Sequence, residues 1–303
     1  MTIDHRFHLV ISTNRSPEHL SRCLASIDSA TVSVFVTVVE QRPEPDALAV
    51  LQPFIDAGHA EYVHHPVVRG ASRGRNAGMA RLRGEIVAFP DDDCWYEVGT
   101  LERLSQRFED PALDGASIPC RSTDDSGTML RWRRRACRVT ARNIPRTVVC
   151  AGILLRRSVL VRTGGFDEEL GTGGGTPWGA GEENDLVLRA LGTGARIRFM
   201  PDLCVRHPDF RAGGMTDETL AKVRRYNRGF GRVLRKHRLW GQAAHWIARS
   251  LVGTVVCTLR GDRPAARFQR TQMVARLQGW LGRDDEGRVH PMVSTVPSVP
   301  TRP

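Results

Sequence analysis

The 303-residue sequence has no cysteine pair at a zinc-binding spacing and no apolar run near Met1 long enough for a secretory signal. Its seven cysteines are odd in number and scattered along the chain. Such a set makes neither a disulfide framework nor a zinc site, and it is typical of a reducing compartment. Together with the missing signal segment, this predicts a cytoplasmic protein.

The sequence also has very little lysine, so arginine carries nearly all of its positive charge. The net charge is +11, and Lys222 and Lys236 are the only lysines. Residues 222–288 hold sixteen basic and four acidic residues, whereas residues 1–221 are almost neutral. A basic nucleic-acid-binding protein is one interpretation of this charge, but no reader motif appears and the body holds acidic clusters. We therefore expect no nucleic-acid partner.

The first 120 residues alternate between apolar runs of strand length and segments with helical spacing. The predicted strands are Phe7–Ser12, Val32–Val39, Tyr62–His64, Ile86–Pro90 and Ala116–Pro119. The predicted helices are Glu18–Ser29, Asp46–Ala57, Ser72–Arg83 and Gly99–Phe108. Alternating strands and helices with short connections are typical of an α/β domain with a mostly parallel sheet flanked by helices.

Beyond residue 120 the pattern is less regular. Residues 121–146 are predicted to form a basic loop, and a strand is expected at Val148–Leu155. Further elements are predicted at Ser158–Thr163 (helix), Glu182–Leu191 (helix) and Arg196–Met200 (strand). After Thr216, glycines 253 and 261 and Pro264 divide a helical region into two or three helices. The predicted domains are a catalytic domain (1–215), a basic helical extension (216–288) and a disordered proline-rich tail (289–303).

Three consecutive carboxylates, Asp91, Asp92 and Asp93, follow the strand predicted at Ile86–Pro90. Placing three such charges together is costly unless a cation neutralises them. The carboxyl edge of a parallel sheet is where α/β proteins bind ligands. Oxygen ligands at this edge suit Mg²⁺ or Mn²⁺, which commonly also hold substrate phosphates. A solvated acidic turn is the structural alternative.

Three further segments carry candidate functional residues. An arginine-bearing helix start, residues 69–78, is suited to bind phosphate, although a solvated basic helix face would look the same. A glycine-rich loop, residues 171–181, leads into Glu182 and Glu183, which could supply a general base or merely favour the helix dipole. His207 stands alone between Arg206 and Pro208, and a lone histidine is more often structural than a ligand.

Taken in order, these segments resemble a family 2 glycosyltransferase of the GT-A fold, over roughly residues 7–209. The segments are R-G-x-x-R-G-R-N-A-G, G-E-I-V-A-F-x-D-D-D-x-W, G-G-F-D-E, G-x-G-E-E-x-D-L-x-x-R and V-x-H-P-D. The resemblance implies an inverting enzyme that transfers a sugar from a nucleoside diphosphate sugar to an acceptor hydroxyl. It also implies Mg²⁺ or Mn²⁺ as cofactor, where the ion neutralises the departing diphosphate.

The resemblance assigns roles residue by residue. Asp91, Asp93 and His207 would hold the metal, and Asp92 would face the ribose. Thr13 and Glu40 would line the base pocket, and Arg73 and Arg75 would lie on the nucleotide side. Glu182 and Glu183 match the acidic pair whose second member is the catalytic base. Glutamate replaces the usual aspartate at positions 40 and 183, so the base assignment stays open between Glu182 and Glu183, with Asp185 a weaker third candidate.

Two questions stay open at this point. A nucleotidyltransferase acting on a sugar phosphate would use similar metal ligands, but its first loop normally carries glycine and lysine, which residues 12–17 lack. The longest uncharged stretch of the basic extension, Ser250–Leu259, is ten residues, half of a transmembrane helix. Its apolar residues are rimmed by arginine and tryptophan, and three interpretations stay open. The stretch could bind an anionic membrane surface on the inner face of the cell membrane, where a lipid-linked or polysaccharide acceptor would be presented. It could instead pack on the catalytic domain or form the interface of a homo-oligomer.

Overall fold

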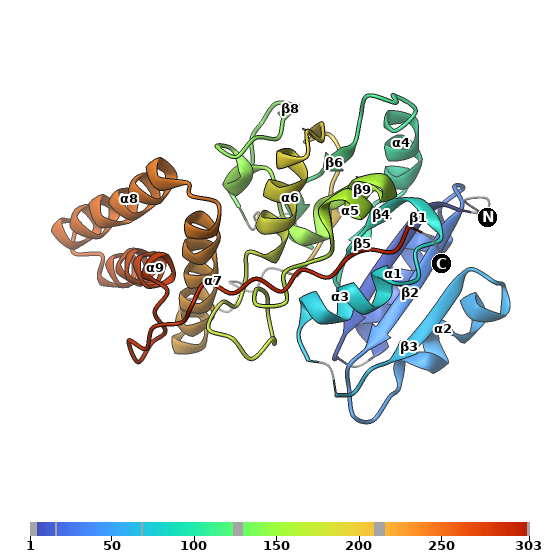
Figure 1. The fold of residues 1–303 in the computed structure, drawn as a ribbon, viewed down its shortest axis with the longest axis horizontal. Coiled ribbons are helices and arrows are strands. Elements are labelled where there is room, and N and C mark those ends of the chain that lie inside the picture. The colour runs from blue at the N-terminus through green and yellow to red at the C-terminus, as the bar shows by residue number, and fades with distance from the viewer. Residues whose placement is uncertain (1–4, 16, 68, 124–129, 209–215, 302–303) are drawn as a thin grey trace.

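The computed structural model describes residues 5–15, 17–67, 69–123, 130–208 and 216–301 (Figure 1). Eight strands form the main sheet, in the order β3-β2-β1-β4-β9-β6-β10-β8. Their bounds are β1 (His5–Thr13), β2 (Val34–Glu40), β3 (Ala60–His64), β4 (Gly84–Ala88), β6 (Gly115–Ser117), β8 (Cys137–Arg138), β9 (Ile153–Arg156) and β10 (Ile197–Phe199). The first four strands are parallel, and β9 and β8 run antiparallel to their neighbours. The predicted α/β class with a mostly parallel sheet is confirmed.

Six helices belong to the part of the chain that carries the sheet. They are α1 (Pro17–Asp28), α2 (Ala47–Asp56), α3 (Ala71–Met79), α4 (Thr100–Arg107), α5 (Arg157–Thr163) and α6 (Glu182–Gly192). Strand alternation decides which helices cover which face: Phe7 and Leu9 of β1 pack in one apolar cluster with α1 and α4, whereas Val10 packs in a second cluster with α3, α5 and α6. The sheet is therefore buried on both faces.

A second, smaller sheet has three short strands, β5 (Trp95–Tyr96), β11 (Val205–Arg206) and β7 (Cys120–Arg121). β11 lies between the other two, antiparallel to β5 and parallel to β7. The segment after β4 is thereby brought beside residues more than a hundred positions later in the chain. This pairing positions one of the candidate metal ligands.

Three long helices follow: α7 (Asp217–Lys236), α8 (Trp240–Leu259) and α9 (Arg263–Leu281). Figure 1 shows them at the end of the molecule away from β1, β2 and β3, with α7 nearest to α6. α7 and α9 approach closely because glycines stand at their crossing: a Cβ on Gly231 would meet the carbonyl oxygen of Arg276, and one on Gly279 that of Arg228. The division at residues 215/216 remains a prediction, since 209–215 lie outside the described residues.

Several predicted boundaries differ from the structure. α3 ends at Met79 rather than Arg83, because the chain turns toward β4 and the Arg83 amide donates to His8 Nδ1 at 2.9 Å. The strand expected from Val148 begins only at Ile153, after a 3₁₀ turn at Cys150–Gly152. Gly253 does not end a helix; it lies within α8, where its missing side chain leaves room for Gln269 of α9.

Residues 121–146, expected as a basic loop, are more regular than predicted. Cys137–Arg138 form β8 against β10, and Ile144–Arg146 form a 3₁₀ turn. Trp132 stacks on Phe199 with ring centroids 6.0 Å apart, so this segment is tied to the sheet by packing as well as by hydrogen bonds. Residues 124–129 of the expected loop lie outside the described residues.

The C-terminal segment contradicts the predicted disorder as far as residue 301. It runs extended from α9 back across the part of the chain that carries the main sheet (Figure 1). The Gly165 amide donates to Pro297 O at 2.8 Å, the Glu168 amide donates to Thr295 O at 2.9 Å, and Val299 is buried. Proline removes backbone donors but keeps its carbonyl acceptor, so a proline-rich segment can still be held along another segment.

Candidate active site

The candidate active site lies at the carboxyl ends of β1, β2 and β4. Thr13 and Glu40 are paired neighbours at the ends of β1 and β2, and Asp91–Asp93 follow β4 after Phe89 and Pro90. The Thr13 hydroxyl donates to Asp92 Oδ2 at 2.6 Å. Burial raises the pKa of Asp92 even though this hydrogen bond opposes the shift. The structure thus joins Thr13 to Asp92, while their roles toward the base and the ribose remain predictions.

His207 reaches the acidic triplet through the small sheet. Arg206 of β11 pairs with Trp95 of β5, directly after the triplet, so the next residue lies over the carboxylates. His207 Nε2 is 3.3 Å from Asp93 Oδ1 and 3.8 Å from Asp91 Oδ2. The predicted grouping of Asp91, Asp93 and His207 is present in the structure. Asp209, the last residue of its sequence motif, lies outside the described residues.

The chemistry of these donors fits a divalent cation. Potential ligand atoms of Asp91, Asp93, Cys94 and His207 all lie within 4.8 Å of one another. In the described part of the chain, Asp93 Oδ1 is buried and accepts no hydrogen bond, which leaves a lone pair free for a cation. Burial, followed by the charge of Asp91, raises the pKa of the Cys94 thiol well above its usual range, so Cys94 stays protonated. Two carboxylates and an imidazole are a donor set that suits Mn²⁺ or Mg²⁺.

Two arginines provide the positive charge beside the triplet. Arg15, in the loop after β1, forms an ion pair with Asp93. Arg75 of α3 is buried and binds two carboxylates, with Nη2 at 2.7 Å from Asp91 Oδ1 and Nη1 at 3.1 Å from Glu182 Oε1. Arg75 therefore joins the metal-ligating segment to the start of α6. The sequence motifs predicted a site role for Arg75 and missed Arg15.

The two glutamates at the start of α6 are in different environments. Glu182 is engaged by Arg75 through Oε1, and its Oε2 has no hydrogen-bond partner among the described residues. Glu183 accepts a hydrogen bond from Asn184 Nδ2 at 2.6 Å, and no described cation is within ion-pair distance. Burial, followed by the charge of Glu182, raises the pKa of Glu183 to about 8. Glu183 is thus the carboxylate of this pair better suited to accept a proton near neutral pH.

Glu40 and Arg73 point to structural partners rather than toward the triplet. Glu40 accepts hydrogen bonds from Asp46 N at 3.1 Å, Ala47 N at 3.2 Å and the Tyr62 hydroxyl at 2.7 Å, so its carboxylate holds the first turn of α2. Arg73 Nε lies 3.3 Å from Glu168 Oε2. Their assignments to the nucleotide base and the nucleotide side remain predictions.

α7 also contributes to the site, which the sequence did not predict. Burial and the charge of Arg15 lower the pKa of Lys222, while Asp93 and Asp91 act in the opposite direction. These effects show that the Lys222 ammonium lies within electrostatic range of Arg15 and of the acidic triplet. Its Nζ lies 5.5 Å from the ring of Tyr226. Both residues sit in a helix that carries no family motif, so only the fold could reveal them.

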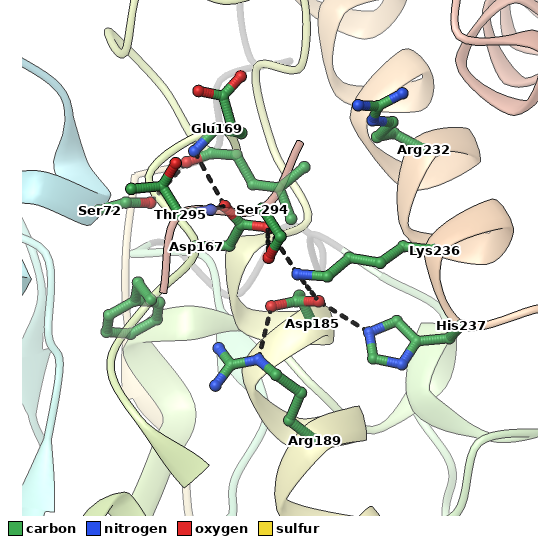
Figure 2. Close-up of polar contacts among 12 residues, drawn as sticks. Ser72, Asp167, Glu169, Asp185, Arg189, Arg232, Lys236, His237, Ser294 and Thr295 are labelled. Carbon is green, nitrogen blue, oxygen red and sulfur yellow. Dashed lines mark hydrogen bonds and ion pairs between the residues drawn. The ribbon is translucent and has the colours of Figure 1, made fainter. Parts of the chain in front are cut away.

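A separate polar network joins α6, α7 and the C-terminal segment (Figure 2). Asp185 is fully buried: Oδ1 is 2.8 Å from Lys236 Nζ and 2.7 Å from His237 Nε2, and Oδ2 accepts from Arg189 Nε at 2.8 Å. Burial alone would raise the pKa of Asp185, but the His237 hydrogen bond and the charges of Arg189 and Lys236 hold it well below its usual range. Asp185, the third candidate base, therefore lies in an ion-paired structural position.

Lys236 connects this carboxylate to a second one, Asp167. Lys236 Nζ lies 2.6 Å from Asp167 Oδ2, which also accepts from the Ser294 hydroxyl at 2.9 Å. Asp167 Oδ1 accepts from the Thr295 amide at 2.9 Å (Figure 2). The described tail is thus bonded to the loop before α6, and both carboxylates have full sets of partners.

The sheet order and the position of the acidic residues at its carboxyl edge are those of the GT-A fold. The sequence profile of glycosyl transferase family 2 matches residues 9–162, about half of the chain, and the chain belongs to this family. Among curated proteins, the pre-mycofactocin glycosyltransferase of Mycobacterium tuberculosis is 31% identical over 157 residues, covering 48% of this chain and 32% of the relative. The chain therefore spans about a third of the length of that relative. Glycosyltransferase AglE of Haloferax volcanii is 25% identical, covering 66% of each chain.

Two groups of solved structures share the fold. The S. aureus TarS 1–349 structure in complex with UDP-GlcNAc has a TM-score of 0.58 at 13% identity and covers 98% of each chain. The mannosyltransferase PcManGT from Pyrobaculum calidifontis, in complex with GDP-Man and Mn²⁺, has a TM-score of 0.61 at 14% identity and covers 91% of this chain and 87% of its own. At these identities the likeness concerns the fold, and it extends over the C-terminal helices.

Proposed function

We propose that the protein is a metal-dependent, inverting glycosyltransferase that moves a sugar from a nucleoside diphosphate sugar to an acceptor hydroxyl. The observation that carries the proposal is the joint position of two groups. The potential metal ligands Asp91, Asp93 and His207 lie together, and Arg75 binds both Asp91 and Glu182, next to Glu183, whose pKa is raised. A family 2 transferase needs both groups on one edge of the sheet, and here a single buried arginine joins them.

The donor half of the site is built from the strand ends. Asp91, Asp93 and His207 would hold Mn²⁺ or Mg²⁺, which when bound neutralises negative charge on the diphosphate leaving group. Asp92, held by the Thr13 hydroxyl, would face the ribose. Arg73 and Arg75 would lie on the nucleotide side, and Glu40 beside the base.

The acceptor half of the site is the start of α6. Glu183 would accept the proton of the acceptor hydroxyl as that oxygen attacks the anomeric carbon, while the bond from that carbon to the diphosphate oxygen breaks. The electron pair of the breaking bond leaves with the diphosphate, so no covalent enzyme intermediate forms. Asn184 orients the carboxylate through its hydrogen bond to Glu183 Oε1.

The experiment is a donor screen by thermal shift and hydrolysis. UDP-GlcNAc and GDP-mannose, the donors in the fold neighbours' crystals, head the panel, each with Mn²⁺, Mg²⁺ or EDTA. We expect one donor to raise the Tm only with metal, and Asp93→Asn to lose both the shift and at least about 10²-fold in turnover. Asp202→Asn, a surface carboxylate paired with Arg103, is the matched control and should behave like wild type. Full turnover in excess EDTA would refute the metal assignment.

The screen also separates the alternative function. A nucleotidyltransferase acting on a sugar phosphate would release pyrophosphate from a nucleoside triphosphate, and it would not hydrolyse a nucleotide sugar. Family membership favours sugar transfer, so we expect no pyrophosphate release. The acceptor would be the end of a polysaccharide or a lipid-linked saccharide.

A further inference from the structure

The outward face of α8 is apolar, the reverse of an ordinary surface helix. Five aliphatic side chains lie on it: Leu251 (50% exposed), Val252 (61%), Val255 (50%), Val256 (37%) and Leu259 (83%). Leu251, Val255 and Leu259 are four residues apart, as are Val252 and Val256, so all five form one stripe along the helix. Such a contiguous exposed apolar stripe marks an interaction surface.

The inward face of α8 carries small and polar residues together with Trp246, whose ring centroid lies 6.2 Å from that of Phe230. Ser250 and Ala243 are the buried residues of α8, and Ser250 Oγ accepts from Arg276 Nη1 at 2.6 Å. Gly253 packs against the side chain of Gln269. Trp246 and Ser250 therefore face α9, whereas the five aliphatic residues of the stripe are left exposed. Packing on the catalytic domain does not explain this stripe, because α8 lies outermost in Figure 1.

The rim of the stripe is positively charged. Arg238 precedes α8, Arg249 flanks the stripe, and Arg260 and Arg263 follow it, and all four side chains are exposed. Between Arg238 and Arg263 the sequence has one acidic residue, Asp262, which caps α9 by accepting a hydrogen bond from the Ala265 amide. Trp240, at the start of the helix, is 67% exposed. Aliphatic, tryptophan and arginine side chains in this arrangement match the acyl, interfacial and anionic headgroup layers of a bilayer.

We propose that α8 docks the protein on an anionic lipid bilayer. In the part of the chain that the structure describes, no helix is long and apolar enough to cross a membrane, so α8 would lie in the plane of the interface with its stripe inserted. Arg238, Arg249 and Arg260 would contact lipid phosphates. A second copy of this chain fits less well, because pairing two α8 helices would bring these arginines together with no acidic residue on either helix to neutralise them.

Membrane docking depends on the proposed function in one respect only. If the protein is a glycosyltransferase, docking would bring it to a lipid-linked acceptor in the bilayer. Docking itself requires no donor, metal or acceptor. Membrane binding and transfer to a soluble acceptor can therefore succeed or fail separately.

The test is flotation of the full chain with vesicles of phosphatidylcholine, alone or mixed with phosphatidylglycerol. We expect flotation with the anionic mixture at low salt, and loss of at least about tenfold in bound fraction for the double variant Val252→Glu, Leu259→Glu. The matched control is Val67→Glu, Val98→Glu, which changes net charge equally at two exposed valines elsewhere (87% and 90% exposed). Arg249→Gln and Arg260→Gln should each weaken binding to anionic vesicles about fivefold.

Light scattering on the same variants tests the alternative in which a second copy of this chain covers the stripe. A monomer in wild type and in both double variants supports the bilayer. If wild type is a dimer that the Val252→Glu, Leu259→Glu variant converts to monomers, the stripe is an oligomer interface and the proposal is wrong. Absence of flotation at low salt also overturns it, and hydrolysis of the nucleotide-sugar donor by the same samples shows whether the transferase proposal still stands.

Discussion

Two groups of carboxylates lie in the catalytic part of this protein, and they differ in how completely their oxygens are paired. Asp167 and Asp185 are buried among Lys236, His237 and Arg189, and every carboxylate oxygen has a partner. The second group, residues 91–93 with Glu182 and Glu183, contains five carboxylates, and buried oxygens of Asp93 and Glu182 accept no hydrogen bond from a described residue.

This difference distinguishes carboxylates that stabilise the fold from carboxylates that we propose act in the site. A buried carboxylate with a full set of donors stabilises the fold around it, and removing it leaves its cation without its partner. An incompletely satisfied cluster is a cost to the fold that persists where a ligand compensates it. On this criterion the Asp167 and Asp185 network holds α6 in place, and the other cluster is the one that we propose binds a cation and a substrate.

The largest expected effect is on stability. Asp185→Asn should lower the free energy of unfolding by about 3 kcal/mol, because it removes the shared partner of Arg189, Lys236 and His237. Urea unfolding measures this loss. Asp93→Asn, which removes one of several crowded charges, should leave the Tm unchanged or raise it. Equal destabilisation by the two variants would remove the distinction between the clusters.

The pH dependence of the stability lost in Asp185→Asn is set by the lowered pKa of Asp185. A carboxylate with a lowered folded-state pKa contributes its stability above the unfolded value near 4, and the contribution fades as the pH falls below it. The difference in unfolding free energy between wild type and Asp185→Asn should therefore be constant from pH 8 to pH 5 and shrink below pH 4. A difference that stayed constant down to pH 3 would show that packing, not charge, holds the network.

The next effect is on catalysis. Glu183→Gln keeps the size of the side chain but removes the proton acceptor, so kcat should fall about 10²-fold or more with donor affinity little changed. Donor binding by calorimetry and transfer by product assay separate the two quantities. Glu182→Gln is the paired variant, and it should disturb the Arg75 contact and the donor half instead. The opposite pattern would exchange the two roles.

A smaller effect follows from the raised pKa of Glu183. The base acts when deprotonated, so kcat/KM of the wild type should rise with pH along a limb whose midpoint lies at or below about 8. A bound cation and the substitution Glu182→Gln should both lower the pH of the midpoint. The cation offsets negative charge near Glu183, and the substitution removes it. A limb that persisted in Glu183→Gln would belong to another group.

The smallest expected effect concerns the tail. Ser294→Ala removes one hydrogen bond to Asp167, which retains Lys236 and two backbone amides, so the loss should be about 1 kcal/mol. Thermal unfolding measures it. Ser298→Ala, in the same segment but without a recorded contact to Asp167, is the matched control.

Much of the sheet and the grouping of the candidate metal ligands could be predicted from the sequence, because the information is local. Asp91–Asp93 follow an apolar strand directly, and the resemblance places His207 by its order in the chain. The contacts of α7 could not be predicted in this way. Lys222 and Lys236 stand in a basic helix whose arginine content suggested solvent or membrane, and only the packing of that helix on α6 reveals which cations face inward.

The tail shows a second limit of sequence reasoning. Four prolines in its last thirteen residues predict disorder by composition, yet Thr295 and Pro297 are held by single backbone contacts to the Glu168 and Gly165 segment. Contacts of this kind need no periodic pattern, so no periodicity analysis could find them. The hydrogen bonds of Glu40 could not be predicted for a similar reason, since its partners Asp46 and Tyr62 are set by tertiary geometry.

The path of this C-terminal segment has a consequence for biosynthesis. Residues of the matched family region and α6 leave the ribosome well before Lys236, His237, Ser294 and Thr295, so Asp167 and Asp185 emerge without their partners. Domains generally fold from the N-terminal side as they are synthesised. Here the loop that carries Asp167 and the helix that carries Asp185 can be held by these partners only after residues 236, 237, 294 and 295 have been synthesised.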